Sequence, residues 1–279
     1  MMKKFLAPSF AAFAIAVIFS SCKKTASSES YTNDALTADK ALVAAAGFNS
    51  GWFEKTTEGK YLIEGDILLT KEQLQNMSGT ASANDFIIAS EEHYRTIELV
   101  NTNGGVRNIT VSLGAGFPAH YSTGLDQALL RYNSLNLTIK FLRVPSGGDI
   151  NITAANLGRT IGGGCVLGQS AGFPTGGNPA AGFTLSTTRC ATTYLNTADK
   201  ADEVMAHEIG HCIGFRHTDY VNRASCGSTS GESAGTIGAV HIAGTPETVS
   251  GNYNSWMMAC TNGSPIFNAE DQVALTTVY

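Results

Sequence analysis

The chain has few charged residues: they make up 15% of its 279 positions, and the formal net charge is −5. No basic stripe runs along it, so the sequence offers no electrostatic surface for nucleic acid. Only two tryptophans are present, and no aromatic platform for carbohydrate is evident. Glycine is plentiful at 30 residues, and hydrophobic residues make up 43%. This composition is globular rather than disordered, and it favours an exported, loop-rich domain with no nucleic-acid partner.

The N-terminus carries an apolar run at residues 5–19, directly after the basic start MMKK. A helix needs roughly 20 apolar residues to cross a bilayer, and Pro8 interrupts this run, so a signal peptide fits better than a membrane anchor. The run ends in FSSC at 19–22, and small residues before a cysteine resemble a bacterial lipobox. We therefore expect residues 1–22 to be a lipoprotein signal peptide with Cys22 lipidated, or else a simple cleaved signal with Cys22 incidental.

Lipidation at Cys22 would tether an otherwise soluble domain to a membrane through one acylated end. The expected location is that of an exported bacterial lipoprotein, at the outer membrane, in the periplasm or on the cell surface. An oxidising compartment also makes disulfides plausible. Five further cysteines lie in the second half of the chain, so at most two bridges form: Cys165, Cys190, Cys212, Cys226 and Cys260. We expect Cys165–Cys190 first, because these two flank one glycine-rich stretch, and the other pairings stay open.

Apolar patterning suggests a tether and further segment at 23–94, followed by one domain at 95–279. A helix is predicted over 37–48 and a strand or bent pair over 60–70. From about residue 95 the order β–α–β–β–β–β–α predicts an α+β fold. The first β is a pair of strands at 95–100 and 107–113 that flank the turn NTNGG, and the later strands are 137–144, 149–157, an edge strand in the glycine-rich stretch that begins at 161, and 183–195. The helices are expected at 122–135 and 198–213. The second of these helices has Asp199 as a possible N-cap.

Three of the six histidines lie in HEIGHCIGFRHTD, residues 207–219. On a helix, His207 and His211 are one turn apart and project from one face, so both imidazoles can reach one cation. Imidazole suits Zn²⁺ at about 2.0–2.1 Å. Glu208 is about 100° further round the helix, where it would reach a metal-bound water rather than the metal.

Gly214 tolerates a positive φ, so it can end the helix and turn the chain back. That turn would bring His217 in as a third ligand, and three protein ligands leave a position open for water, as in a catalytic zinc site. The spacing H-E-x-x-H-x-x-G-x-x-H with a downstream methionine turn is the metzincin pattern. SWMM at 255–258 follows His217 by about forty residues, so Met257 is the candidate turn methionine and Met258 the second choice.

On these residues the chain resembles the metzincin zinc endopeptidases. The form HEIGHCIGFRHTD resembles the bacterial dual-action HEIGH metallopeptidases, over roughly residues 95–279. The resemblance implies a zincin-like fold, with a mixed, mostly parallel sheet, an antiparallel edge strand, an active-site helix and a Met-turn. It also implies one catalytic Zn²⁺, a metal-activated water with Glu208 as general base, and a protein or peptide substrate lying along the edge strand. Residues 161–173 are the candidate for that strand.

Some positions depart from the related families. Astacin and serralysin relatives carry a tyrosine two residues after the turn methionine, where this chain has Ala259, so no fifth ligand is expected there. Asp219 is expected to hold the turn through a hydrogen bond or to be solvated. Cys212 suits a disulfide or the core better than the metal. The three histidines outside the motif have no ligand spacing and are expected to be ordinary: His93, His120 and His241.

Residues 23–94 stand where secreted peptidases often carry a pro-segment. No cysteine lies between Cys22 and Cys165, which excludes a cysteine switch. LIEGDI at 62–67 resembles the pro-segment motif of astacins, although Ile63 stands where those proteins have phenylalanine. Asp66 is therefore a candidate switch that fills the open zinc position; the alternative is an ordinary turn that joins two strands.

The competing function is a lipid-anchored, zinc-containing binding protein without catalytic activity. It predicts tight zinc binding but no cleavage of any unfolded protein. The intact Glu208 argues against it.

Overall fold

The computed structural model describes residues 33–51, 53–56, 59–78, 93–159, 165–246, 254–260 and 266–279. The expected signal peptide and its Cys22 lie outside these ranges. Within the described ranges, none of the helices combines the length and the apolar character that crossing a bilayer requires.

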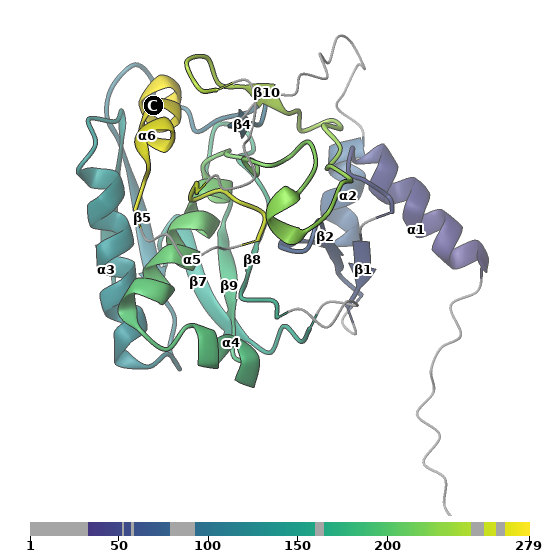
Figure 1. Ribbon diagram of the computed structural model, residues 1–279, viewed down its shortest axis with the longest axis horizontal. Coiled ribbons are helices and arrows are strands. Elements are labelled where there is room, and N and C mark those ends of the chain that lie inside the picture. Colours follow the sequence, from purple (N-terminus) through teal and green to yellow (C-terminus); the bar gives the residue numbers. More distant parts are fainter. Residues whose placement is uncertain are drawn as a thin grey trace, which may run out of the picture.

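An eight-stranded sheet runs through the middle of the molecule in the order β1-β2-β3-β8-β9-β7-β5-β6 (Figure 1). β7 pairs in parallel with β9, and β5 pairs in parallel with both β6 and β7, whereas β8 runs antiparallel to β9. The mixed, mostly parallel sheet predicted from the sequence is therefore confirmed. Its strands are β1 (Phe53–Lys55), β2 (Tyr61–Ile63), β3 (Ile67–Leu69), β5 (Arg107–Leu113), β6 (Ile139–Val144), β7 (Ile150–Ala155), β8 (Gly168–Ser170) and β9 (Gly182–Ser186). A small second sheet pairs β4 (Tyr94–Arg95) with β10 (Val240–His241).

The helices are α1 (Asn33–Ala45), α2 (Lys71–Ser78), α3 (Ala119–Asn133), α4 (Arg189–Tyr194), α5 (Ala198–Cys212) and α6 (Ala269–Val278), with a 3₁₀ turn at Ala224–Cys226. Helices α3 and α5 pack closely because Gly124 has no side chain. A Cβ at this position would lie 2.7 Å from the Ala198 carbonyl oxygen. The hydroxyl of Tyr132 donates a hydrogen bond to the Ala206 carbonyl at 2.7 Å. The contact fixes α5, the helix that carries the histidine motif, against α3.

The buried apolar side chains form two clusters. The larger one joins β5, β6, β7 and β9 to α3, α5 and α6. The smaller one is built mainly from α1, β2, β3 and α2, and Phe173 is its buried contribution from the rest of the chain. The N-terminal strands thus belong to the same sheet as the rest of the protein (Figure 1), whereas the apolar side chains around them form a cluster of their own.

Four sequence expectations differ from the structure. The single strand predicted at 183–195 is β9 followed by α4, because the Thr188 side chain caps a new helix by accepting from the Ala191 amide. The cap of α5 is Thr197 and not Asp199, which lies in the first turn. The edge strand expected within 161–173 is wrong for the described part, since β8 is flanked by β9 on one side and by β3 on the other. The strand predicted at 95–100 shrinks to β4.

Two disulfides tie the second half of the chain. Cys165–Cys190 is the pair expected from the sequence, and Cys226–Cys260 is the second. Cys212 is a free thiol, fully buried in the larger core. Its Sγ lies 3.6 Å from the Gly182 carbonyl oxygen, as expected for a core position.

Candidate metal centre

The site begins at the C-terminal end of α5. His207 and His211 lie one turn apart on this helix, and the chain leaves it at Gly214, whose φ is 105°. Space is restricted there as well, because a Cβ on Gly214 would lie 2.9 Å from both the Leu99 side chain and the Thr96 hydroxyl. The glycine turn brings His217 back towards the helix, as the spacing predicted.

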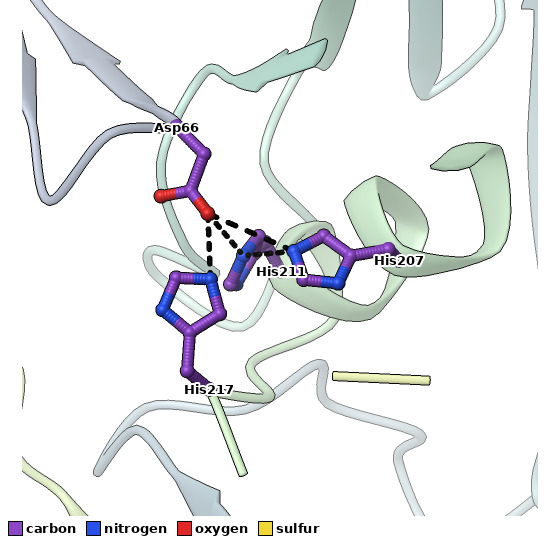
Figure 2. A group of neighbouring side chains, drawn as sticks. All are labelled: Asp66, His207, His211 and His217. Carbon is purple, nitrogen blue, oxygen red and sulfur yellow. Dashed lines mark hydrogen bonds and ion pairs between the residues drawn. The ribbon is translucent and has the colours of Figure 1, made fainter. Parts of the chain in front are cut away.

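The three imidazoles and Asp66 meet at one point, as Figure 2 shows. One ligand atom from each of the four residues lies within 4.8 Å of the others. The Nε2 atoms of His207 and His211 are 3.1 Å apart. Asp66 Oδ2 lies 3.7 Å from each of these and 2.6 Å from His217 Nε2. Ligand atoms about 2 Å from a shared ion are roughly 3–4 Å apart, so most of these spacings suit a single cation.

Each imidazole is held from behind through its Nδ1. His207 Nδ1 is 2.9 Å from the Trp256 carbonyl oxygen, and His211 Nδ1 is 2.9 Å from that of Phe215. His217 Nδ1 is hydrogen-bonded to the carboxylate of Glu232. Carbonyl oxygens and ionised carboxylates only accept hydrogen bonds, so Nδ1 carries the proton in all three rings.

This tautomer determines what the centre can bind. With the proton on Nδ1, the Nε2 lone pairs of His207 and His211 face each other across 3.1 Å, which is repulsive in the neutral rings. His217 Nε2 has no well-aligned hydrogen-bond partner among the described side chains, although it is buried close to Asp66. A divalent cation would satisfy all of these atoms together, and imidazole with carboxylate is a donor set that Zn²⁺ accepts. The residues present therefore fit a metal ion.

Asp66 comes from the turn between β2 and β3, above the histidines in Figure 2. Its backbone carbonyl accepts a hydrogen bond from the Ser170 amide at 2.7 Å, which holds the turn against β8. Burial alone would raise the pKa of Asp66, but the positive charge of His217 and the closeness of the three imidazoles hold that pKa well below its usual range. Asp66 does lie in a turn that joins two strands, which was the alternative considered from the sequence. The same turn also places Asp66 beside the three histidines.

His217 is the most strongly polarised of the three rings. Burial lowers its pKa, but the negative charges of Asp66 and Glu232 outweigh burial and raise the pKa to about 10. By contrast, burial lowers the pKa of His211 to about 4. The electrostatic field at the centre therefore favours a positive charge beside His217.

Glu208 lies next to the three imidazoles in a buried position. Its Oε2 has no hydrogen-bond partner among the described residues, and Gly168 of β8 makes room for Oε1, because a Cβ there would lie 2.4 Å from that atom. Burial, reinforced by the charge of Asp66, raises the pKa of Glu208 well above its usual range. A cavity of about 260 Å³ is lined by Glu208, Asp66 and His207, with apolar side chains such as Val204.

The loop at 255–258 packs against α5. Trp256 supplies the carbonyl that holds His207, and the Met257 carbonyl accepts a hydrogen bond from the Thr218 amide at 2.7 Å. Met257 is buried, and a Cβ on Gly210 would lie 2.4 Å from its sulfur. The candidate turn methionine thus lies directly beside the helix of the motif.

Asp219 is buried and holds this region together. Its carboxylate accepts hydrogen bonds from the Ser225 amide at 2.9 Å, the Ser225 hydroxyl at 2.6 Å and the Ala259 amide at 2.9 Å. Asp219 therefore stabilises the turn, which is one of the two roles considered from the sequence.

The remaining three histidines lie outside the group of metal-capable side chains found in the described residues. His93 contacts Asp271 at 2.8 Å, His120 contacts the Leu195 carbonyl at 2.8 Å, and His241 contacts the Thr245 hydroxyl at 3.0 Å. Each of the three has a polar partner of its own, away from the metal-capable group.

A buried ionic network behind His217 was missed by the sequence analysis. Arg216 pairs with Glu64 at 3.0 Å and with Glu232 at 3.2 Å, and Arg223 pairs with Glu232 at 2.7 Å. Charge on His217 and the two arginines overcomes burial and lowers the pKa of Glu232 to about 2. No spacing in the sequence connects these residues, and a lone acid in a glycine- and serine-rich loop (SGESAG) is the only signal.

Comparison with known proteins agrees with the metal-binding character of the site. The sequence model of the family described as dual-action HEIGH metallo-peptidases matches residues 61–279. No curated protein matches the chain. Two solved structures of myroilysin are similar to it at 16% identity: one covers 67% of this chain and 98% of its own with a TM-score of 0.40, and the other covers 65% and 93% with a TM-score of 0.35. The chain belongs to the dual-action HEIGH metallopeptidase family and is a metal-dependent hydrolase of peptide bonds.

Proposed function

We propose that the protein is a zinc-dependent endopeptidase of the metzincin type, in which His207, His211 and His217 hold one catalytic Zn²⁺. The observation that carries this proposal is the shared tautomer of the three rings, because every Nδ1 faces an acceptor and every Nε2 faces the common point. Zn²⁺ is preferred among divalent ions because buried imidazole nitrogens are its usual ligands. Protein or peptide chains are the substrates.

A bound Zn²⁺ would lower the pKa of a water molecule to about 7 and polarise the scissile carbonyl. Glu208 is the general base in this proposal: its free Oε2 accepts the proton of the attacking water and then delivers it to the leaving amine. The water oxygen forms a bond to the carbonyl carbon, and the peptide C–N bond breaks. A raised pKa suits this role, since the carboxyl must both accept and return a proton near neutral pH.

Met257 forms the floor of the centre in this proposal. Its sulfur lies against Gly210 inside the motif, and its carbonyl anchors the residue that follows His217. This arrangement supports a zincin-like fold with a Met-turn at 255–258.

We further propose that residues 23–94 act as a pro-segment for a catalytic domain at 95–279. Asp66 would fill the position that substrate and water need, and β3 pairs with β8 at the place where an extended substrate could add to the sheet. The separate hydrophobic cluster of α1, β2, β3 and α2 supports a segment that can leave as a unit.

The N-terminus supports an anchor. Residues 1–22 combine a basic start, an apolar run and FSSC, which supports a lipoprotein signal with Cys22 as the acylated residue. The protein would then be exported and tethered to the outer membrane, facing the periplasm or the cell surface. A Cys22→Ser variant that still incorporates a labelled fatty acid would remove this part of the proposal.

The test of the function is metal analysis of the purified protein together with cleavage of casein and of a peptide library. We expect about one zinc per chain, cleavage that stops when a chelator removes the metal, and recovery on adding Zn²⁺. Tight zinc binding without cleavage, even after the N-terminal segment has been removed, would overturn the proposal.

A further inference from the structure

Glu232 lies directly behind His217, in a loop that the sequence does not mark as functional. Its side chain is 1% exposed. One carboxylate oxygen, Oε1, accepts hydrogen bonds from His217 Nδ1 and from Arg223 Nη1, the latter at 2.7 Å. The other, Oε2, accepts from Arg216 Nη2 at 3.2 Å. Both oxygens are therefore committed, and the carboxylate has one orientation.

The loop that carries Glu232 is itself fixed. The Glu232 amide donates to the Tyr220 carbonyl at 2.8 Å. Gly231 permits this approach, because a Cβ there would lie 2.1 Å from the Val221 carbonyl oxygen. Arg216, whose side chain is fully buried, also donates to the carbonyls of Gly238 at 3.0 Å and Ser233 at 3.1 Å. The groups that hold the carboxylate are thus hydrogen-bonded to the backbone themselves.

His217 needs such support more than the other two histidines do. His207 and His211 belong to α5, so the helix and a backbone carbonyl together set the direction of each ring. His217 follows the turn at Gly214 and has no helix to orient it. Glu232 supplies the side-chain contact that fixes its ring and its tautomer.

We propose that Glu232 is a positioning residue for His217 and that it sets the metal affinity of the centre. This inference rests on the proposed function, since it assumes that His217 is a ligand. A carboxylate behind an imidazole fixes the orientation and tautomer of the ring and strengthens it as a donor to the metal, and loss of such a partner typically costs about 10–100-fold in metal affinity. Glu232 touches neither substrate nor metal.

The experiment measures Zn²⁺ affinity of the full-length protein by competition with a chromogenic chelator. Glu232→Gln is the deciding variant, because it keeps the shape and can still accept from Nδ1 but loses the charge. We expect its affinity to fall about 10-fold and that of Glu232→Ala to fall about 100-fold. Asp202→Asn is the matched control: Asp202 is also buried on a guanidinium, that of Arg131, but does not touch a histidine of the centre. Its affinity should equal that of the wild type.

A second readout is the visible spectrum of the Co²⁺-loaded protein, which reports the ligand field. We expect altered bands in Glu232→Gln and wild-type bands in Asp202→Asn. The inference about Glu232 would be overturned if Glu232→Gln bound Zn²⁺ as tightly as the wild type, or if Asp202→Asn lost as much affinity as Glu232→Gln. Neither result would affect the proposed function. Wild-type protein that binds no Zn²⁺ would instead overturn the proposed function.

Discussion

At the scale of single residues, the proposed chemistry depends most directly on Glu208. Its Oε2 lacks a hydrogen-bond partner among the described residues, and its pKa is raised by burial. General acid–base catalysis contributes roughly 10²–10⁴-fold to rate. We therefore expect Glu208→Ala to retain its zinc but to lose peptidase activity by at least that factor. Metal analysis beside a peptide assay checks both halves; wild-type cleavage by the variant would remove Glu208 from this role.

Gly168 offers a subtler test of the same carboxylate. An added Cβ would lie 2.4 Å from Glu208 Oε1, so Gly168→Ala should displace the carboxylate without removing it. We expect a fall in kcat of about 10²-fold, of the order that a 1 Å misplacement costs, with metal affinity unchanged. Gly105→Ala is the control, because nothing lies within 4 Å of its Cβ position. Equal activity in the two variants would show that Gly168 does not shape the site.

Residue spacing predicted part of this centre and could not predict the rest. His207, His211 and His217 lie within one helix turn and one glycine turn of each other, so local geometry alone brings them together. Glu232 reaches His217 only through the path of a long loop, which no sequence period encodes. Asp66 is the intermediate case, since its motif resembled a known one but only the sheet pairing brings it to the histidines.

At the scale of elements, the β2–β3 hairpin contains a local conflict. Its turn has two consecutive residues with positive φ, Glu64 at 55° and Gly65 at 91°. Asparagine, aspartate and glycine suit such turns, and glutamate does not. Glu64 is nevertheless buried there, paired with Arg216 at 3.0 Å. The ion pair therefore stabilises a backbone conformation that the residue itself disfavours.

We expect the hairpin to loosen when this ion pair is lost. Glu64→Asn favours the turn but cannot keep the ion pair, and Glu64→Gln keeps the length but loses the charge. In both, loss of a charged hydrogen bond should cost about 1–3 kcal/mol. Hydrogen exchange should then speed up at 61–69 and stay unchanged in β5 and β7. Glu72→Gln, on the exposed face of α2, is the control. Wild-type exchange in Glu64→Asn would mean that turn geometry, rather than the ion pair, holds the hairpin.

The sequence predicted elements better than their boundaries. β5, β6, β7, α3 and α5 lie where apolar periodicity placed them. Caps and short elements were harder: Thr188 starts α4 inside a run rich in β-branched residues that favours a strand. β8 was expected at an edge, because a glycine-rich segment gives no sign that a distant hairpin will pair with it.

At the scale of the whole molecule, the N-terminal segment shares a sheet with the rest but keeps a separate core. This segment reaches the metal centre through Asp66. If that carboxylate blocks the metal, Asp66→Ala in the full-length chain should raise peptidase activity about 10-fold or more. Asp66→Asn, which keeps the shape, should raise it less. An equally inactive Asp66→Ala protein would end the idea of an aspartate switch.

Metal removal should lower the thermal stability of the whole protein, because the centre joins α5, the loop of His217 and the β2–β3 hairpin. Ligand at a thousand times its Kd stabilises a protein by about 4 kcal/mol, or roughly 10 °C in Tm for a domain of this size. We expect a fall of this order when a chelator is added during thermal unfolding, and recovery with Zn²⁺. An unchanged Tm in protein shown by analysis to have lost its metal would contradict a structural link.

The close approach of Gly210 to the sulfur of Met257 means that residues far apart in the sequence limit each other's size. A Cβ at Gly210 would lie 2.4 Å from the Met257 sulfur and 3.0 Å from Trp256 Nε1, so two neighbouring residues of the loop leave no space for a side chain on this face of the helix. The fourth residue of HEIGH is therefore restricted to glycine by the packing of a loop far downstream, and a larger residue there would require that loop to move away from α5.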